Sequence, residues 1–129
     1  MKLVVATPLE LVVDADDVRE VRAEDPTGLF GVRPGHAAFL TVLVPSVLRW
    51  TTDRARYVAV RGGVLSVRGD RVDVATREAV VGDVLDALEG EVLRRFAEAD
   101  EQERVARTRA ARLEVEAVRR IALGLRARP

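Results

Sequence analysis

The sequence predicts an α+β protein in which an N-terminal antiparallel β-sandwich, residues 1–82, is followed by a C-terminal hairpin of two helices, residues 83–129. Up to Gly82, short Val-rich runs alternate with turn residues, which is the pattern of an all-β sandwich or barrel. From Asp83 onward the turn residues almost vanish, and apolar residues recur every three or four positions, which is the helical period.

The first segment contains nine apolar runs of strand length. They are Leu3 to Ala6, Leu9 to Val13, Val18 to Ala23, Leu29 to Val32, Ala38 to Val44, Val47 to Thr51, Tyr57 to Val60, Val64 to Val67 and Val72 to Ala75. Among the residues between the runs, Gly69-Asp70 separates two period-2 patterns and predicts a tight hairpin. We expect Pro45-Ser46 and Gly62-Gly63 to form turns as well.

The second segment predicts two helices. One apolar stripe consists of Leu85, Leu88, Val92, Phe96 and Ala99, and a second consists of Ala111, Val115, Val118, Ala122 and Leu125. Asp83 is the expected N-cap of the first helix. Asp100 followed by Glu103 resembles a capping box and suggests a break near residues 99–100, although a single uninterrupted helix is the competing prediction.

The two halves of the helical segment carry opposite charge, −6 over residues 83–103 and +6 over residues 104–129. This complementarity favours a hairpin only weakly, because each exposed ion pair contributes about 0–1 kcal/mol. Two short helices are marginal without tertiary packing. The segment is therefore expected to dock on the sandwich or on another protein, and weak docking would allow a switch between partners.

Composition excludes several classes of protein. The 129 residues include 21 Lys+Arg, 21 Asp+Glu, one His and no Cys. A disulfide framework, a thiol nucleophile and a multi-histidine metal site are therefore not expected. The balanced charge gives no electrostatic case for nucleic acid as the main partner. No apolar run approaches the ~18 residues of a membrane span, and the apolar start of the chain is interrupted too early for a signal peptide, so we expect a mature, cytosolic chain without direct membrane insertion.

The chain also lacks the sequence patterns of an active site. It has no phosphate-binding loop motif, and Gly62-Gly63 has neither the spacing nor the following helix of a dinucleotide site. Neither Ser46 nor Ser66 lies in a nucleophile motif. The acidic run from Asp14 to Asp17 lacks the glycine and distal glutamate of a calcium loop and is predicted to be a solvated turn. We expect a non-catalytic protein without cofactors.

The most constrained stretch runs from Gly28 to Thr41. Pro34-Gly35 fits the central positions of a type II turn, with Gly35 supplying a positive φ. A stiff loop of this kind would present the apolar residues Leu29 and Phe30 on a rigid frame, as recognition surfaces often do.

This stretch resembles the epsilon subunit of F-type ATP synthases, whose corresponding motif reads approximately G-x-x-G-x-x-P-G-H-A-x-x-L-T. The chain then continues with Gly62-Gly63-Val64-Leu65-Ser66-Val67, similar to the G-G-x-x-x-V run of the family, and the resemblance extends over residues 3–82. The family's β-sandwich and pair of helices match the division inferred above, whereas residues 91–129 match in architecture only, which suggests a divergent branch such as the alternate sodium-type synthases.

The resemblance implies a non-catalytic subunit at the cytoplasmic side of a bacterial membrane, peripheral and within the complex. Its partners would be the gamma subunit, the membrane rotor ring and, through the helices, the catalytic alpha and beta subunits. Applied to this chain, it assigns eight partner-binding residues and a regulatory helix. The residues expected in the loop that faces the ring are Leu29, Phe30, Gly31 and Arg33. The other partner-binding residues are Pro34, Gly35, His36 and Thr41, of which His36 and Thr41 are expected to face gamma. The residues of the regulatory helix are Arg112, Arg119 and Arg120.

Some features depart from the family or have a simpler explanation. Many members have an acidic residue where this chain has Leu29. The family's ATP-binding motif loses its cation at Glu89, so we expect no ATP sensing. His36 could also hydrogen-bond within the sandwich, and Phe39 and Trp50 are core candidates.

A second hypothesis, from a different class, is a free-standing β-sandwich module whose basic helix docks on nucleic acid or anionic membrane. Its mark would be binding that weakens steeply with salt and no affinity for synthase subunits. A small hydrolase is a third class, and no pair of carboxylates in the sequence supports it.

Overall fold

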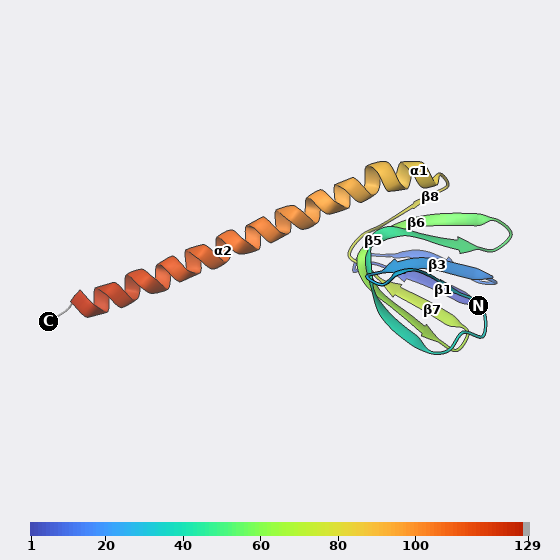
Figure 1. The fold of residues 1–129 in the computed structure, drawn as a ribbon, viewed down its shortest axis with the longest axis horizontal. Coiled ribbons are helices and arrows are strands. Elements are labelled where there is room, and N and C mark those ends of the chain that lie inside the picture. Colours follow the sequence, from blue (N-terminus) through green and yellow to red (C-terminus); the bar gives the residue numbers. More distant parts are fainter. Residues whose placement is uncertain (128–129) are drawn as a thin grey trace. The chain divides into compact units, whose positions relative to one another are not determined.

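The computed structural model describes residues 1–127, so the last two residues of the predicted helical segment lie outside the described residues. Its strands are β1 (Lys2–Ala6), β2 (Leu11–Ala15), β3 (Glu20–Asp25), β4 (Gly28–Val32), β5 (Phe39–Thr51), β6 (Ala55–Arg68), β7 (Arg71–Ala75) and β8 (Ala79–Gly82). They form one sheet in the order β2-β1-β7-β6-β5-β3-β4, with β8 added on β6 (Figure 1). The pairs are antiparallel except β1 with β7, which run parallel.

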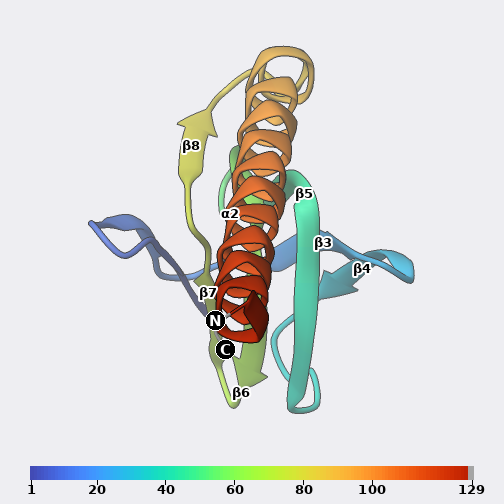
Figure 2. The same cartoon turned by 90° about the vertical axis from the view of Figure 1, so that its left-hand side faces the viewer.

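Two long strands create the sandwich by bending together. The upper half of the β5–β6 hairpin pairs with β3 and β8, and the lower half of β6 pairs with β7 (Figure 2). Pairing between β5 and β6 is interrupted only at Val44 and Gly62, and the register is the same on either side. The sheet therefore folds over on itself at this bend. Sixteen buried residues, most of them Val and Leu, fill the space between the two halves.

The predicted turns at Pro45-Ser46 and Gly62-Gly63 are wrong, because both pairs lie inside continuous strands, and four predicted runs merge into β5 and β6. Gly62 and Gly63 have φ values of 70° and 114°, so they bend the strand without reversing it. Gly63 also lies where an added Cβ would come 2.0 Å from the carbonyl oxygen of Ala75 on β7. The sequence pattern did not predict β8.

Other local predictions are confirmed. Gly69-Asp70 connects β6 to β7 as a two-residue loop, with Gly69 at a φ of 56°. The backbone N–H of His36 donates to the carbonyl of Arg33 at 3.1 Å and closes the turn at Pro34-Gly35, where Gly35 has a φ of 86°. Trp50 is buried in the core, and the half-buried side chain of Phe39 packs against the core.

The β-sandwich followed by a helical segment is confirmed, but the predicted hairpin is not formed. The segment is one run of helix, α1 (Leu85–Ala87), a π-helical turn η1 (Leu88–Val92) and α2 (Leu93–Ala127) (Figure 1). No Gly or Pro occurs from Leu93 to Leu123, and the strong helix formers there outweigh the few tenths of a kcal/mol that Asp100 costs. At the expected break Arg104 instead donates to Glu101 at 2.6 Å, one turn apart.

The chain divides into two units: residues 1–96 form the first, and the second begins at Ala97. The start of the helix belongs to the first unit, where Leu88 and Phe96 are buried with Ala59 of β6. The predicted N-cap at Asp83 is wrong, since the cap residue is Val84 and no side chain bonds there. The predicted domain boundary after residue 82 stays a prediction.

Candidate functional site: the β3–β4 hairpin and the face of β5 and β6

The loop between β4 and β5 is held from below by a buried carboxylate. The Asp25 side chain accepts hydrogen bonds from the Thr27 backbone N–H at 2.9 Å and the Thr27 hydroxyl at 2.5 Å. It also accepts one from the Thr41 hydroxyl of β5 at 2.8 Å. These donors favour the ionised form, so the two hydroxyls, Thr27 first, lower the pKa of Asp25. One side chain thus ties the β3–β4 turn to the strand that follows the loop.

Aromatic rings brace the same loop. Phe30 of β4 meets Phe39 of β5 edge to face with ring centroids 5.5 Å apart, and His36 approaches Phe39 at 6.0 Å. The His36 ring lies at the surface with Nδ1 2.7 Å from the carbonyl oxygen of Ala37. These contacts brace the loop from Gly28 to Phe39 against β5.

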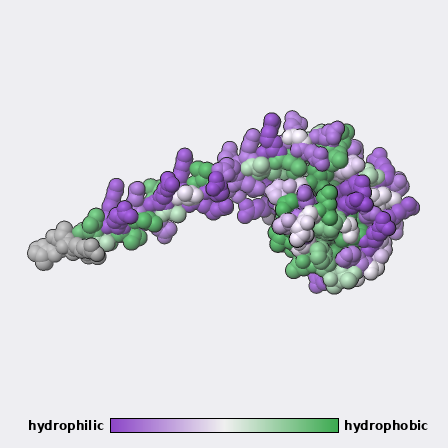
Figure 3. All heavy atoms as spheres, viewed as in Figure 1, coloured by the Kyte–Doolittle hydropathy of each residue, from purple (hydrophilic) through white to green (hydrophobic). Residues whose placement is uncertain are grey.

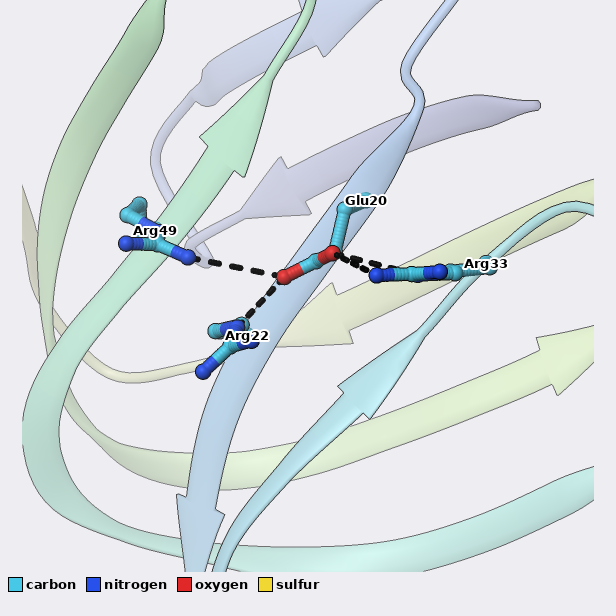
Figure 4. Close-up of polar contacts among 4 residues, drawn as sticks. All are labelled: Glu20, Arg22, Arg33 and Arg49. Carbon is cyan, nitrogen blue, oxygen red and sulfur yellow. Dashed lines mark hydrogen bonds and ion pairs between the residues drawn. The ribbon is translucent and has the colours of Figure 1, made fainter.

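Three arginines converge on one carboxylate beside the loop (Figure 4). Glu20 of β3, 17% exposed at its side chain, forms ion pairs with Arg22, with Arg33 at 3.1 Å and with Arg49 of β5 at 3.5 Å. The hydrogen bond from Arg22 is the main reason that the pKa of Glu20 is lowered, and Arg33 adds to it. Within this cluster three positive charges meet one negative charge.

The cluster forms one wall of a shallow groove. Glu20, Arg22 and Arg33 line it together with residues 29–31 and 34–36. Its floor is Gly31, which pairs with Arg22 across β3 and β4. The groove therefore combines positive charge with the exposed apolar side chain of Leu29.

A second surface is apolar and lies on the outer face of β5 and β6. Leu40, Val42 and Val64 are exposed on it, and Val64 pairs with Ala75 of β7. The groove lined by Ala6, Pro8, Gly63 and Ala75 continues this surface toward β1. Apolar side chains gather over this part of the sandwich (Figure 3). A contiguous apolar face on a sheet is typical of a protein–protein contact.

The predicted site residues fall into three environments. Leu29, Gly31, Arg33, Pro34, Gly35 and His36 are exposed around the groove, with Phe30 half-buried beneath them. Thr41 is half-buried, and its hydroxyl bonds to Asp25, while its neighbours Leu40 and Val42 are the exposed ones. Arg112, Arg119 and Arg120 are exposed on α2.

Sequence reasoning missed Glu20, Arg22 and Arg49, which lie near Arg33 only because β3 pairs with both β4 and β5. It also missed Leu40, Val42 and Val64 as a surface. Their signal was available: the run Phe39 to Val44 is apolar at successive positions apart from Thr41, which means that both faces of a strand are apolar.

Among residues 1–127 no group of three or more His, Asp or Glu is placed to hold a metal ion. No helix within the described part of the chain is long and apolar enough to cross a membrane.

Comparison with known proteins agrees with this geometry. Residues 1–82 match the family model described as ATP synthase, Delta/Epsilon chain, beta-sandwich domain. ATP synthase epsilon chain 2 of Paraburkholderia xenovorans (strain LB400) is 43% identical over 129 residues, covering 98% of this chain and 93% of the relative. ATP synthase epsilon chain 2 of Cereibacter sphaeroides is 42% identical over 122 residues, covering 92% and 84%.

Two solved assemblies contain a chain of similar fold. One is the OSCP/F1/c-ring structure of the Euglena gracilis mitochondrial ATP synthase, with a TM-score of 0.60 and 24% identity over 80% of this chain and 62% of that one. The other is the central stalk/c-ring structure of the Tetrahymena thermophila mitochondrial ATP synthase, with a TM-score of 0.55 and 15% identity over 77% and 89%.

The family model thus defines the class as the delta and epsilon chains of ATP synthases, which share this β-sandwich. Within that class, identity over almost the whole length decides the assignment: the chain belongs to the ATP synthase epsilon chain family. It is a non-catalytic subunit of that enzyme complex.

Proposed function

We propose that the chain is part of the central stalk and connects the gamma subunit to the membrane rotor ring, so that ion flow is coupled to ATP synthesis. The observation that carries this proposal is the 43% identity to an epsilon chain over 98% of the sequence. The similar chains in the Euglena and Tetrahymena assemblies support it, because both come from structures that contain the c-ring.

Two surfaces of the sandwich suit two partners. The loop residues Leu29, Phe30, Gly31 and Arg33 would meet the ring. His36 and the apolar face of Leu40, Val42 and Val64 would meet gamma. Both surfaces are exposed on an ordered frame, so binding would cost little conformational entropy. In this arrangement the subunit lies at the cytoplasmic side of a bacterial membrane as a peripheral part of the complex.

The test is association with separately purified partners. The full chain should bind isolated gamma and isolated ring, and Val42→Asp should reduce the first while leaving the second. If the unaltered chain binds neither, the proposed function is wrong.

The helix α2 is proposed to contact the catalytic alpha and beta subunits and to restrain ATP hydrolysis. Its apolar residues Leu113, Val118 and Ile121 are exposed, and its basic residues Arg112, Arg119 and Arg120 suit an acidic surface. Because the packed start of the helix belongs to the unit of residues 1–96, removing residues 97–129 should leave it intact. We expect the complex with this truncation to hydrolyse ATP faster. An unchanged rate in the truncated complex would remove the inhibitory role and leave the stalk role standing.

ATP sensing by the isolated chain is not expected. The first helical turns carry Glu89 where a cation would meet phosphate, and Gly90 lies in the π-helical turn η1. Titration calorimetry of the full chain with ATP should give no heat of binding at micromolar concentrations.

A further inference from the structure

The groove beside the β3–β4 hairpin has more positive charge than its own residues neutralise. Among the described residues, Glu20 is the carboxylate that bonds Arg22, Arg33 and Arg49, so this cluster keeps an excess of two positive charges. Arg33 is 76% exposed and Arg22 57%, so their guanidinium groups can bind a further anion without leaving Glu20. A guanidinium has five N–H donors in a planar fork, more than one carboxylate oxygen can use.

Neither the backbone conformation nor a lack of space requires glycine at the floor of the groove. Gly31 has no positive φ, and the nearest atom to an added Cβ would be 4.0 Å away. The fold would therefore accept a larger residue at this position. Glycine inside a strand weakens it, and often marks a place where another chain approaches the backbone closely. Gly31 is on β4, which pairs only with β3 and forms an edge of the sheet.

The groove is small and of mixed character. Leu29, 79% exposed, stands on one side of Gly31, and Glu24 pairs with Leu29 across the strands. Because strand side chains alternate, Glu24 lies on the same face as Arg22. The positive field is therefore bounded by a carboxylate and an apolar side chain. Such a site suits a short protein loop with an acidic residue better than a nucleic acid or a bilayer, which need extended basic surface.

We propose that this arginine groove, made by Arg22 and Arg33 above Gly31 and beside Leu29, binds an acidic loop of the rotor ring through one of its carboxylates. The inference rests on the proposed function, in which this loop faces the ring, and adds the chemistry of the contact. Glu20 acts as a positioning residue, because its ion pairs hold the guanidinium groups of Arg22 and Arg33 at the rim of the groove.

The experiment measures equilibrium binding of the full chain to purified ring in neutral detergent, at low and moderate salt. The variants are Arg22→Ala with Arg33→Ala, which removes the charge, and Gly31→Gln, which fills the floor without changing the charge. The matched control is Arg54→Ala with Arg68→Ala, which removes two exposed arginines at strand ends elsewhere in the sandwich.

We expect the Arg22/Arg33 double variant to bind about a hundredfold more weakly, since each hydrogen-bonded charge pair accounts for about a factor of ten. Its binding should also lose most of its salt dependence. Gly31→Gln should weaken binding about tenfold, and the control should stay within about twofold. Gamma binding should be unchanged in all of them, which shows that the variants are folded.

Different results separate the two proposals. Ring binding that is unaffected in both groove variants overturns the arginine groove and leaves the stalk function intact. Failure of the unaltered chain to bind the ring, with gamma binding kept, overturns the arginine groove alone. Failure to bind both the ring and gamma overturns both proposals. Binding through the same arginines to phosphatidylglycerol vesicles, with no affinity for the ring, would also overturn the inference, in favour of a lipid headgroup.

Discussion

Replacing Gly63 with alanine tests the account of how the sandwich folds over. Gly63 has a φ of 114°, and an added Cβ would lie 2.0 Å from the carbonyl oxygen of Ala75. The backbone conformation costs a side chain about 1–3 kcal/mol. Moving β6 away from β7 to relieve the overlap costs about a further 1–3 kcal/mol. We therefore expect Gly63→Ala to lower the free energy of unfolding by about 4 kcal/mol, a large share of the ~5–15 kcal/mol that a domain has.

Urea denaturation of the full chain, followed by fluorescence, measures this directly. The chain has one tryptophan, and Trp50 is buried in the core of the sandwich, so its emission reports the unfolding of that unit. With a slope of ~2 kcal/mol per molar urea, the midpoint should fall by about 2 M.

Two other glycines provide matched controls for the same chemical change. Gly69 also has a positive φ, 56°, but no atom lies within 4 Å of an added Cβ, so Gly69→Ala should cost only about 1–2 kcal/mol. Gly31 has neither constraint, and Gly31→Ala should leave stability the same or raise it by about 0.5 kcal/mol. If Gly63→Ala costs no more than Gly69→Ala, the close approach of β6 to β7 is not what fixes the bend.

Three further predictions follow from burial, charge and exposure. Phe96→Ala should release the helix start, because truncating a buried Phe costs about 3–5 kcal/mol, so trypsin should cleave there roughly a hundredfold to a few thousandfold faster. Leu113→Ala, at an exposed site, should not change the rate. The pKa of Asp25 is lowered in the folded state, so the stabilisation from its ionised form is present above the unfolded pKa of about 3.9 and is lost as pH falls through the folded pKa. Asp25→Asn should therefore lose less stability than the unaltered chain below about pH 4, when the urea midpoint is measured as a function of pH. Val42→Asp should reduce gamma binding in a pull-down at unchanged thermal stability, whereas Val84→Asp, at another exposed valine, should bind normally.

The sequence allowed the fold to be predicted where the cause is local. The hairpin at Gly69-Asp70 and the turn at Pro34-Gly35 follow from the backbone preferences of the residues themselves. Turn-favouring residues did not predict a chain reversal correctly at Pro45 and at Gly62-Gly63, because there they bend the paired strands β5 and β6 together at the same point. The pairing of β5 with β6 and the approach of Gly63 to Ala75 of β7 distinguish such a bend from a reversal, and the sequence pattern contains neither.

The predicted break in the helical segment was wrong for another reason. Asp100 and Glu103 have the spacing of a capping box, but such a box takes effect only where the chain already leaves the helix. No Gly or Pro interrupts the helix at this point, and an ion pair between Glu101 and Arg104 spans it. Helix formers on both sides therefore decide the outcome.

The residues of the candidate site also divide into those that local sequence identifies and those that only strand pairing brings together. Residues 28–36 could be identified from their own motif, whereas Glu20, Arg22 and Arg49 could not. The side-chain bonds within the cluster connect residues up to 29 positions apart in the chain. Their convergence depends on the register of β3 with its two neighbours, and a shift of one residue would turn Glu20 toward the core.

The two carboxylates of β3 explain how this register produces a binding surface. Asp25 points inward and ties Thr27 to Thr41, which fixes the hairpin to β5. Glu20 points outward and fixes the arginines. Because their separation of five positions puts them on opposite faces of the strand, one side chain orders the backbone of the loop while the other orders its charges. A partner that binds here meets a loop and a charge pattern that are already in place, so the free energy of its contacts is not spent on ordering them.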